Sequence, residues 1–168
     1  MTPTAISLCS GYGGLDLAVE HVYGAHTVAV ADIDRDACTV LAHRFPHAPN
    51  LGDLRSVDWT GVTADIITAG YPCQPFSTAG RRKGEHDPRH LWPEVLRAIR
   101  MVRPRLAVLE NVRGHLGLGF ATVLADLAAA GFDAEWVVLR ASDVGAAHGR
   151  ARLFVAATNT DSQPARGD

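Results

Sequence analysis

Cysteine is scarce in this chain of 168 residues, and its spacing argues against two common uses of the residue. The three cysteines, Cys9, Cys38 and Cys73, are odd in number and lie far apart, so they predict neither a disulfide framework nor a paired zinc motif. The eight histidines are scattered as well, and we expect each to be a surface or loop residue rather than a ligand. The sequence therefore predicts no metal and a reducing, cytoplasmic setting.

Net charge and long apolar runs are also lacking. The net charge is only −2, so any contact with nucleic acid has to come from a local basic segment. The chain shows no basic leader before its first apolar run and nothing near the ~18 apolar residues of a membrane span, so we expect no membrane partner. With 47% hydrophobic residues and no internal repeat, the chain is expected to fold as one domain.

Short apolar runs alternate with amphipathic stretches along the chain. This alternation predicts an α/β fold with a seven-stranded, mostly parallel sheet and helices on both faces. We expect a single domain over residues 1–159, followed by a disordered polar tail over 160–168. The predicted strands are 5–9, 26–31, 51–54, 65–69, 105–109, 132–139 and 153–157, and the predicted helices are 15–23, 35–45, 91–102 and 120–130.

A glycine-rich loop, Ser10-Gly11-Tyr12-Gly13-Gly14, lies between the first strand and the first helix. Glycines let the backbone approach a ligand closely, and the helix offers free N–H groups, so this loop predicts a cofactor site. Asp16 stands where the dinucleotide pattern has its third glycine, which disfavours a nicotinamide-dependent oxidoreductase. Asp32 ends the second strand, where such folds bind ribose hydroxyls, whereas Asp34 is placed to cap the next helix. Asp53 ends the third predicted strand, where it is either a ligand of the cofactor or an ordinary turn residue.

The second glycine-led turn, residues 70–77, follows the buried strand 65–69 and contains Cys73 between Pro72 and Pro75. A rigid turn at the carboxyl end of a strand suits a positioned nucleophile, although a lone Pro-Cys pair is more often structural. The basic, glycine-flanked segment 80–90 comes next, and it reads either as a lid that meets a phosphate backbone or as a solvated loop.

Charged residues mark the ends of two later strands. Glu110 follows the apolar run 105–109, where a carboxylate is costly unless it is paired or functional. Arg150 and Arg152 enter the last strand two residues apart, so their side chains can point the same way toward one ligand.

The string Gly70-Tyr71-Pro72-Cys73-Gln74-Pro75-Phe76-Ser77 resembles the nucleophile motif of the cytosine-C5 DNA methyltransferases, which carry a Rossmann-like fold and use S-adenosylmethionine. Its companion motifs occur in order over residues 5–158. By this resemblance, catalysis is assigned to Cys73, Glu110, Asn111, Arg150 and Arg152, and cofactor binding to Ser10, Gly11, Tyr12, Gly13, Gly14, Asp32, Ile33, Asp53, Leu54, Pro72 and Leu91.

The resemblance also implies a mechanism. Cys73 adds to C6 of a cytosine flipped out of duplex DNA, and the activated ring takes the methyl group of S-adenosylmethionine at C5. Glu110 hydrogen-bonds N3 and the exocyclic amine, Arg152 binds O2, and Asn111 holds the cysteine loop. Arg150 or Arg152 supplies the positive charge that favours the thiolate. Loss of the C5 proton and elimination of Cys73 regenerate the enzyme, whose usual setting is restriction-modification.

Three positions depart from the family pattern. Ser7 and Cys9 stand where Asp and Phe are usual, and His148 replaces a Gln. The chain also ends after its last predicted strand, where the family continues into a target-recognition domain. We therefore expect either a minimal enzyme of low specificity or one completed by a separate recognition subunit. The same chemistry on a free cytosine nucleotide or on RNA, and a non-catalytic subunit that binds cofactor or DNA, remain the alternatives.

Overall fold

The computed structural model describes residues 1–72 and 91–162, which form six strands, four α-helices and four short 3-10 helices. No helix in these two ranges is long and apolar enough to cross a bilayer. The strands are β1 (Thr4–Leu8), β2 (His26–Ala31), β3 (Ile66–Ala69), β4 (Leu106–Val112), β5 (Phe132–Arg140) and β6 (Ala151–Asn159), and the α-helices are α1 (Gly14–Tyr23), α2 (Arg35–Arg44), α3 (Trp92–Val102) and α4 (Phe120–Ala129).

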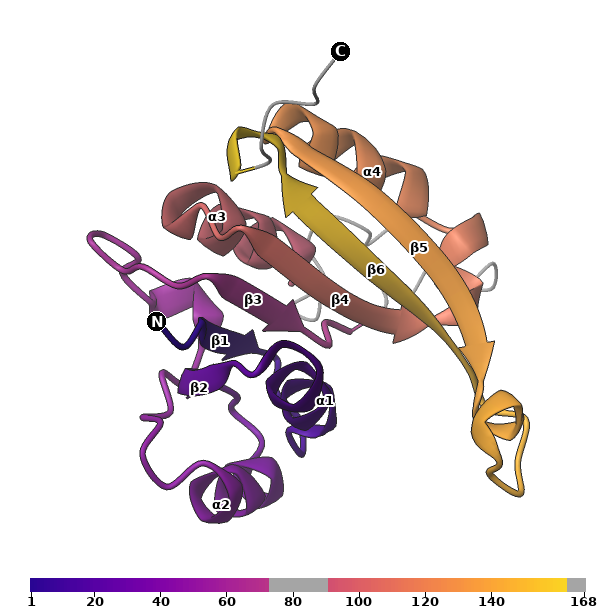
Figure 1. The fold of residues 1–168 in the computed structure, drawn as a ribbon, viewed down its shortest axis with the longest axis horizontal. Helices are drawn as coiled ribbons and strands as arrows, with labels where there is room; N and C mark the ends of the chain where they lie inside the picture. The colour runs from indigo at the N-terminus through magenta and orange to yellow at the C-terminus, as the bar shows by residue number, and fades with distance from the viewer. Residues whose placement is uncertain (73–90, 163–168) are drawn as a thin grey trace, which may run out of the picture.

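The six strands form one sheet in the order β2-β1-β3-β4-β6-β5 (Figure 1). Strands β2, β1, β3 and β4 are parallel neighbours, and β6 runs antiparallel between β4 and β5. The apolar runs of β1 and β3 are buried nearly throughout, as expected of central parallel strands. The predicted α/β, mostly parallel architecture is therefore confirmed.

The predicted strand over 51–54 is wrong. In this region only Asn50 forms an isolated bridge, to Val30 of β2. Gly52 then takes a left-handed φ of 72°, and the Asp53 side chain accepts a hydrogen bond from the Arg55 N–H at 3.0 Å. These two features turn the backbone into a 3-10 helix (Leu54–Ser56), so the described sheet has six strands rather than seven.

Helices cover both faces of the sheet, as predicted. On one face, Val19 of α1 packs against Ala5 and Ile66. On the other face, helices α3 and α4 contribute Ile99 and Leu127 to the main core. The predicted helix ends are also confirmed, because the Asp34 side chain accepts the Ala37 N–H at 2.8 Å, and Gly24 ends α1 with a φ of 62°.

The strands β4, β6 and β5 carry one face that the described helices leave partly uncovered, here called the open face. It is formed by every second residue of each strand, and directly opposite residues of β4, β6 and β5 form rows across it. Val137 is 48% exposed and Leu139 is 41% exposed, whereas their neighbour Val138 packs against the core on the opposite face. The two rows nearest the carboxyl end of β4 are Glu110, Phe154 and Val137, and then Val112, Arg152 and Leu139.

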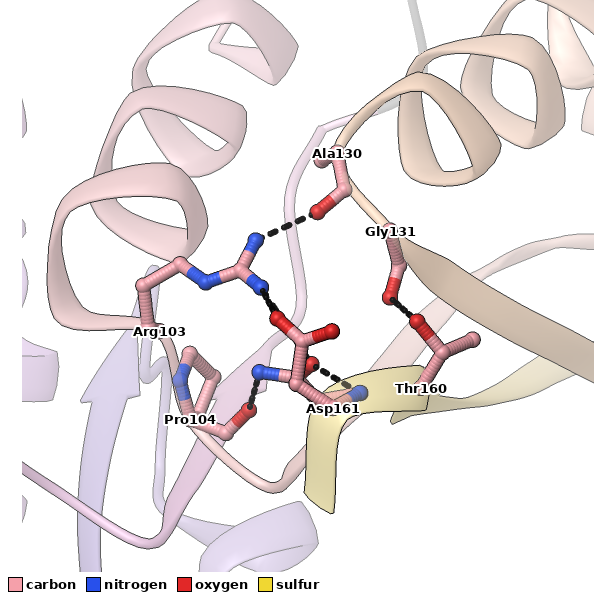
Figure 2. A network of polar contacts seen from close by, with 7 residues as sticks. Arg103, Pro104, Ala130, Gly131, Thr160 and Asp161 are labelled. Carbon is pink, nitrogen blue, oxygen red and sulfur yellow. Dashed lines mark hydrogen bonds and ion pairs between the residues drawn. The ribbon is translucent and has the colours of Figure 1, made fainter. Parts of the chain in front are cut away.

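Residues Thr160–Ser162 form a 3-10 helix, so the disorder expected from residue 160 is wrong for these three positions. Figure 2 shows how they are held. Arg103 donates to the Ala130 carbonyl at 2.6 Å and pairs with Asp161 at 2.5 Å. The Thr160 hydroxyl donates to the Gly131 carbonyl at 2.9 Å. The rest of the predicted tail, residues 163–168, lies outside the described residues.

The Arg103 contacts predict a graded loss of stability. Arg103→Met removes the donor to a buried carbonyl and should lower the free energy of unfolding by about 1–2 kcal/mol. Asp161→Asn removes only an exposed ion pair and should cost less than about 1 kcal/mol. Urea unfolding of both variants measures the difference. Equal losses would show that the carbonyl contact contributes nothing beyond the ion pair.

Candidate active site

Two cavities open at the carboxyl ends of the parallel strands, and they share Cys9, Gly11 and Gly70 as wall residues. The first cavity has a volume of about 530 Å³ and the second of about 540 Å³. Ligands of open α/β sheets bind at this edge because the loops that follow parallel strands converge there. Predicted site residues line the first cavity (Ser10, Gly11, Tyr12, Gly14, Glu110 and Arg150) and the second (Gly11, Asp32, Ile33, Asp53, Leu54, Pro72 and Leu91).

The glycine-rich loop is fixed by hydrogen bonds to the β2 end. The Ser10 hydroxyl accepts the Ala31 N–H at 3.2 Å, and the Gly11 N–H donates to an Asp32 carboxylate oxygen at 2.7 Å. Gly13 has a φ of 76°, and a Cβ there would lie 2.6 Å from the Phe45 ring. Gly13 therefore packs against α2 and is the one member of the predicted loop that lines neither cavity.

Two carboxylates lie on the second cavity. Asp32 accepts backbone N–H groups from Gly11 at 2.7 Å and Asp34 at 2.9 Å, and each oxygen keeps a lone pair for a ligand. Asp53 caps the 3-10 helix and pairs with Arg55 at 3.2 Å. Apolar side chains stand beside these acids, with Leu54 buried in the wall. The second cavity thus combines acceptors for hydroxyl or amino groups with an apolar surface.

Glu110 and Arg152 form an ion pair with 2.6 Å between Oε1 and Nε, and both side chains are about a quarter exposed. Gly70 lies beside this pair and close to β1, because a Cβ there would lie 3.3 Å from the Cys9 carbonyl oxygen, a tight contact, and 3.7 Å from a Glu110 oxygen, an ordinary one. Arg150 is exposed and lines the first cavity together with Glu110. The structure therefore brings three of the predicted catalytic residues to one place.

Cys73 and the basic segment 80–90 lie outside the described residues. The described chain ends before them at Tyr71 and Pro72, and Asn111 Nδ2 donates to the Tyr71 carbonyl at 3.0 Å. This contact gives Asn111 the geometry expected of a residue that holds the cysteine loop.

The sequence reasoning missed two buried polar residues. Asp16 lines the first cavity, accepts a hydrogen bond from the Thr68 hydroxyl and is 2% exposed, and its burial raises its pKa. The available signal was the helical spacing of Asp16 and Val19: they are three residues apart, which places Asp16 on the same buried side of α1 as Val19. His115 is 3% exposed and is bonded to Tyr71, against the expectation that every histidine is a surface or loop residue. No sequence pattern indicated that contact.

Cys9 is a poor nucleophile despite its place between the cavities. Burial, and next the charge of Asp32, raise the pKa of its thiol to about 12. The thiol therefore stays protonated at neutral pH, where only a thiolate would react.

The rate of alkylation should distinguish Cys9 from Cys38. Because its thiol is buried and protonated, Cys9 should resist iodoacetamide in the native protein between pH 7 and pH 9 and react only after unfolding. Peptide mass spectrometry at each pH measures the modification, with Cys38 as the half-buried internal comparison. Native modification of Cys9 at pH 7 would contradict the assigned protonation state.

Solved structures share this architecture and place it among the Rossmann-like methyltransferase folds. A DNMT2 mutant from Spodoptera frugiperda superimposes with a TM-score of 0.81 at 23% identity, over 99% of this chain and 53% of that one. A putative DNA modification methyltransferase encoded within a prophage of E. coli gives a TM-score of 0.77 at 25% identity, over 95% of this chain and 47% of that one.

The chain belongs to the C-5 cytosine-specific DNA methylase family, whose model matches residues 4–166. It is 36% identical to the type II methyltransferase M.NgoMIV of Neisseria gonorrhoeae, over 93% of this chain and 52% of the relative. It is 30% identical to M.BsuFI of Bacillus subtilis, over 94% of this chain and 40% of the relative. The chain thus spans about half the length, or less, of these relatives.

Proposed function

We propose that this chain is the catalytic part of an S-adenosylmethionine-dependent DNA methyltransferase that acts on C5 of cytosine in duplex DNA. The observation that carries the proposal is the Glu110–Arg152 ion pair beside the first cavity, next to the segment that leads to Cys73. Membership of the family and the type II methyltransferase relatives support the same reaction and a role in restriction-modification. We place the protein where its DNA substrate is, in the cytoplasm.

The two cavities fit the two halves of S-adenosylmethionine. Asp32 and Asp53 offer acceptors for ribose hydroxyls and an adenine amine, and the apolar wall suits the base. The first cavity offers the loop over residues 10–14 and the buried carboxylate of Asp16 to the charged amino acid part. When bound, S-adenosylmethionine supplies an electrophilic methyl group. We assign its binding to these residues.

Glu110 and Arg152 complement a flipped cytosine in charge and hydrogen bonding. The carboxylate can accept from the exocyclic amine, and the guanidinium can donate to the O2 carbonyl and stabilise the negative charge that develops there. The paired arginine also offsets the cost of partly burying Glu110. Arg150, exposed at the mouth of the first cavity, is free of the Glu110 pair and can meet a phosphate or the thiolate of Cys73.

Product analysis tests the reaction directly. Duplex DNA incubated with the chain and S-adenosylmethionine should contain 5-methylcytosine after nuclease digestion and mass spectrometry. Cys73→Ser should abolish the product because no thiol can add to C6, and Glu110→Gln should lower the rate by about 100-fold or more. Cys38→Ser serves as the matched cysteine control and should stay active. Methylation of free dCTP or RNA in preference to DNA would overturn the substrate assignment, and 5-methylcytosine formed by Cys73→Ser would overturn the role of Cys73.

We propose further that the open face binds a recognition polypeptide that these 168 residues do not include. The face is apolar at Phe154, Val137 and Leu139, and its rows contain Glu110 and Arg152, so it is continuous with the active site. The relative from Neisseria gonorrhoeae is nearly twice as long as the matched region, which leaves it ample chain to cover such a face. A partner seated there would border the first cavity and could direct DNA into it.

A chimera tests this partner. The part of the Neisseria gonorrhoeae relative outside the matched region is joined to this chain, and methylation of DNA is compared with that of the 168 residues alone. Val137→Asp should impair the chimera at least about tenfold, because a charge would be buried against the partner. Met101→Asp on α3 is the matched control, since Met101 is 47% exposed and Val137 is 48% exposed. Equal activity of the two variants, or a chimera no more active than the chain alone, would contradict docking on the open face.

A further inference from the structure

Tyr71 is held at three points, although it lies in the loop that leaves β3 toward Cys73. Its carbonyl accepts the Asn111 side-chain N–H at 3.0 Å. Its hydroxyl lies 3.1 Å from His115 Nε2, and its ring packs against Trp92 with 5.3 Å between the ring centroids. Loop residues are usually exposed and mobile, yet Tyr71 is only 3% exposed. The entry to the Cys73 segment is therefore fixed in position.

His115 is the partner of the hydroxyl and is itself firmly placed. It belongs to a 3-10 helix (Arg113–Gly117) that follows β4 directly, and its ring packs against Phe120 in an edge-on arrangement with 5.8 Å between the ring centroids. Burial lowers the pKa of His115, and a hydrogen bond to the Leu118 backbone opposes this by less, so the ring is neutral at pH 7. A neutral imidazole has one donor and one acceptor nitrogen, and the nitrogen that faces the Tyr71 hydroxyl is Nε2.

Both polar anchors of Tyr71 come from the segment that carries Glu110. Asn111 follows Glu110 directly, and His115 follows four residues later. The two anchors bind opposite ends of Tyr71, so they fix its direction as well as its position. A shift of His115 would let the tyrosine ring move while the carbonyl stayed bound.

We infer that His115 is a positioning residue of the active site: with Asn111 it fixes Tyr71 relative to Glu110, and so fixes the point from which the chain continues through Pro72 toward Cys73. This inference rests on the proposed methyltransferase function. It differs from a purely structural role, in which the buried pair would stabilise the fold without affecting the reaction.

Four variants test the inference in the full chain: His115→Leu, His115→Gln, Tyr71→Phe, and the double variant of Tyr71→Phe with His115→Leu. Four readouts are compared with the wild type. They are the thermal unfolding midpoint, the Kd for S-adenosylhomocysteine by calorimetry, the alkylation rate of Cys73 by iodoacetamide, and kcat for methyl transfer to duplex DNA.

If His115 positions the segment, His115→Leu and Tyr71→Phe should lower kcat about tenfold or more and change the Cys73 alkylation rate at least about threefold. The Kd for S-adenosylhomocysteine should stay within about twofold, because neither residue lines the first or the second cavity. His115→Gln keeps an acceptor and should restore most of both rates. The double variant should be no worse than the single variants, because they remove the same contact.

Two results would overturn the inference. In the first, His115→Leu lowers the unfolding midpoint while kcat and Cys73 alkylation stay at wild-type values, which leaves only a structural role. In the second, His115→Gln is as impaired as His115→Leu, which excludes the hydrogen bond as the cause. If the wild type forms no 5-methylcytosine, the proposed function of the chain alone fails, and the alkylation rates still decide whether His115 acts on the Cys73 segment.

Discussion

The ion pair between Glu110 and Arg152 depends on β6, the one antiparallel strand among the described strands of the sheet. Arg152 lies at the start of β6, whereas Glu110 lies near the end of β4. In an all-parallel sheet the start of one strand lies at the opposite edge from the end of its neighbour, and the two side chains would be separated by the strand length. Because β6 runs back along β4, Val112 pairs directly with Arg152. Glu110, two residues before Val112 on β4, is therefore the diagonal neighbour of Arg152. The insertion of β6 therefore brings the arginine to the edge where ligands bind.

Close backbone approach is the second constraint on the site. Cys9 begins the turn after β1 with a left-handed φ of 50°, and its carbonyl faces Gly70 at the end of β3. Both residues line the two cavities, so they form the wall between them. A side chain at position 70 would press on the Cys9 carbonyl and reach toward Glu110. The glycine at this junction thus lets the walls of the two cavities lie next to each other.

The sequence predicts much of the fold because local signals and global structure agree there. Helix α2 begins at the Asp34 cap and α1 ends at Gly24, since both depend on residues within one turn of the helix. The strand expected over 51–54 failed for the opposite reason. Two leucines three residues apart can be buried by a turn as well as by a strand, and Gly52 favours the turn.

Many residues at the candidate site were singled out from the sequence, but Asp16 and His115 were not, and neither were the contacts between distant members. Glu110 and Arg152 were each singled out, yet their pairing depends on strand register across 42 residues of sequence, which no local pattern specifies. The bond between Tyr71 and His115 is of the same kind, because it joins residues 44 apart. Asp53 was expected at a strand end and is found in a helix cap, but it reaches the second cavity from there.

Strand β4 places two neighbouring site residues, Glu110 and Asn111, on opposite faces of the sheet. Successive side chains of a strand point to opposite faces, so neighbours in sequence serve different sides. Glu110 lies on the open face with Arg152, beside the first cavity. Asn111 lies on the face with Ala107 and Leu109, where it is 4% exposed and binds Tyr71. Glu110, the proposed contact to the base, is therefore partly exposed on the open face, whereas Asn111, which binds the Tyr71 carbonyl, is buried among the helices. A change on the open face can alter access to Glu110 without moving Tyr71, because the two residues are held from opposite sides of the sheet.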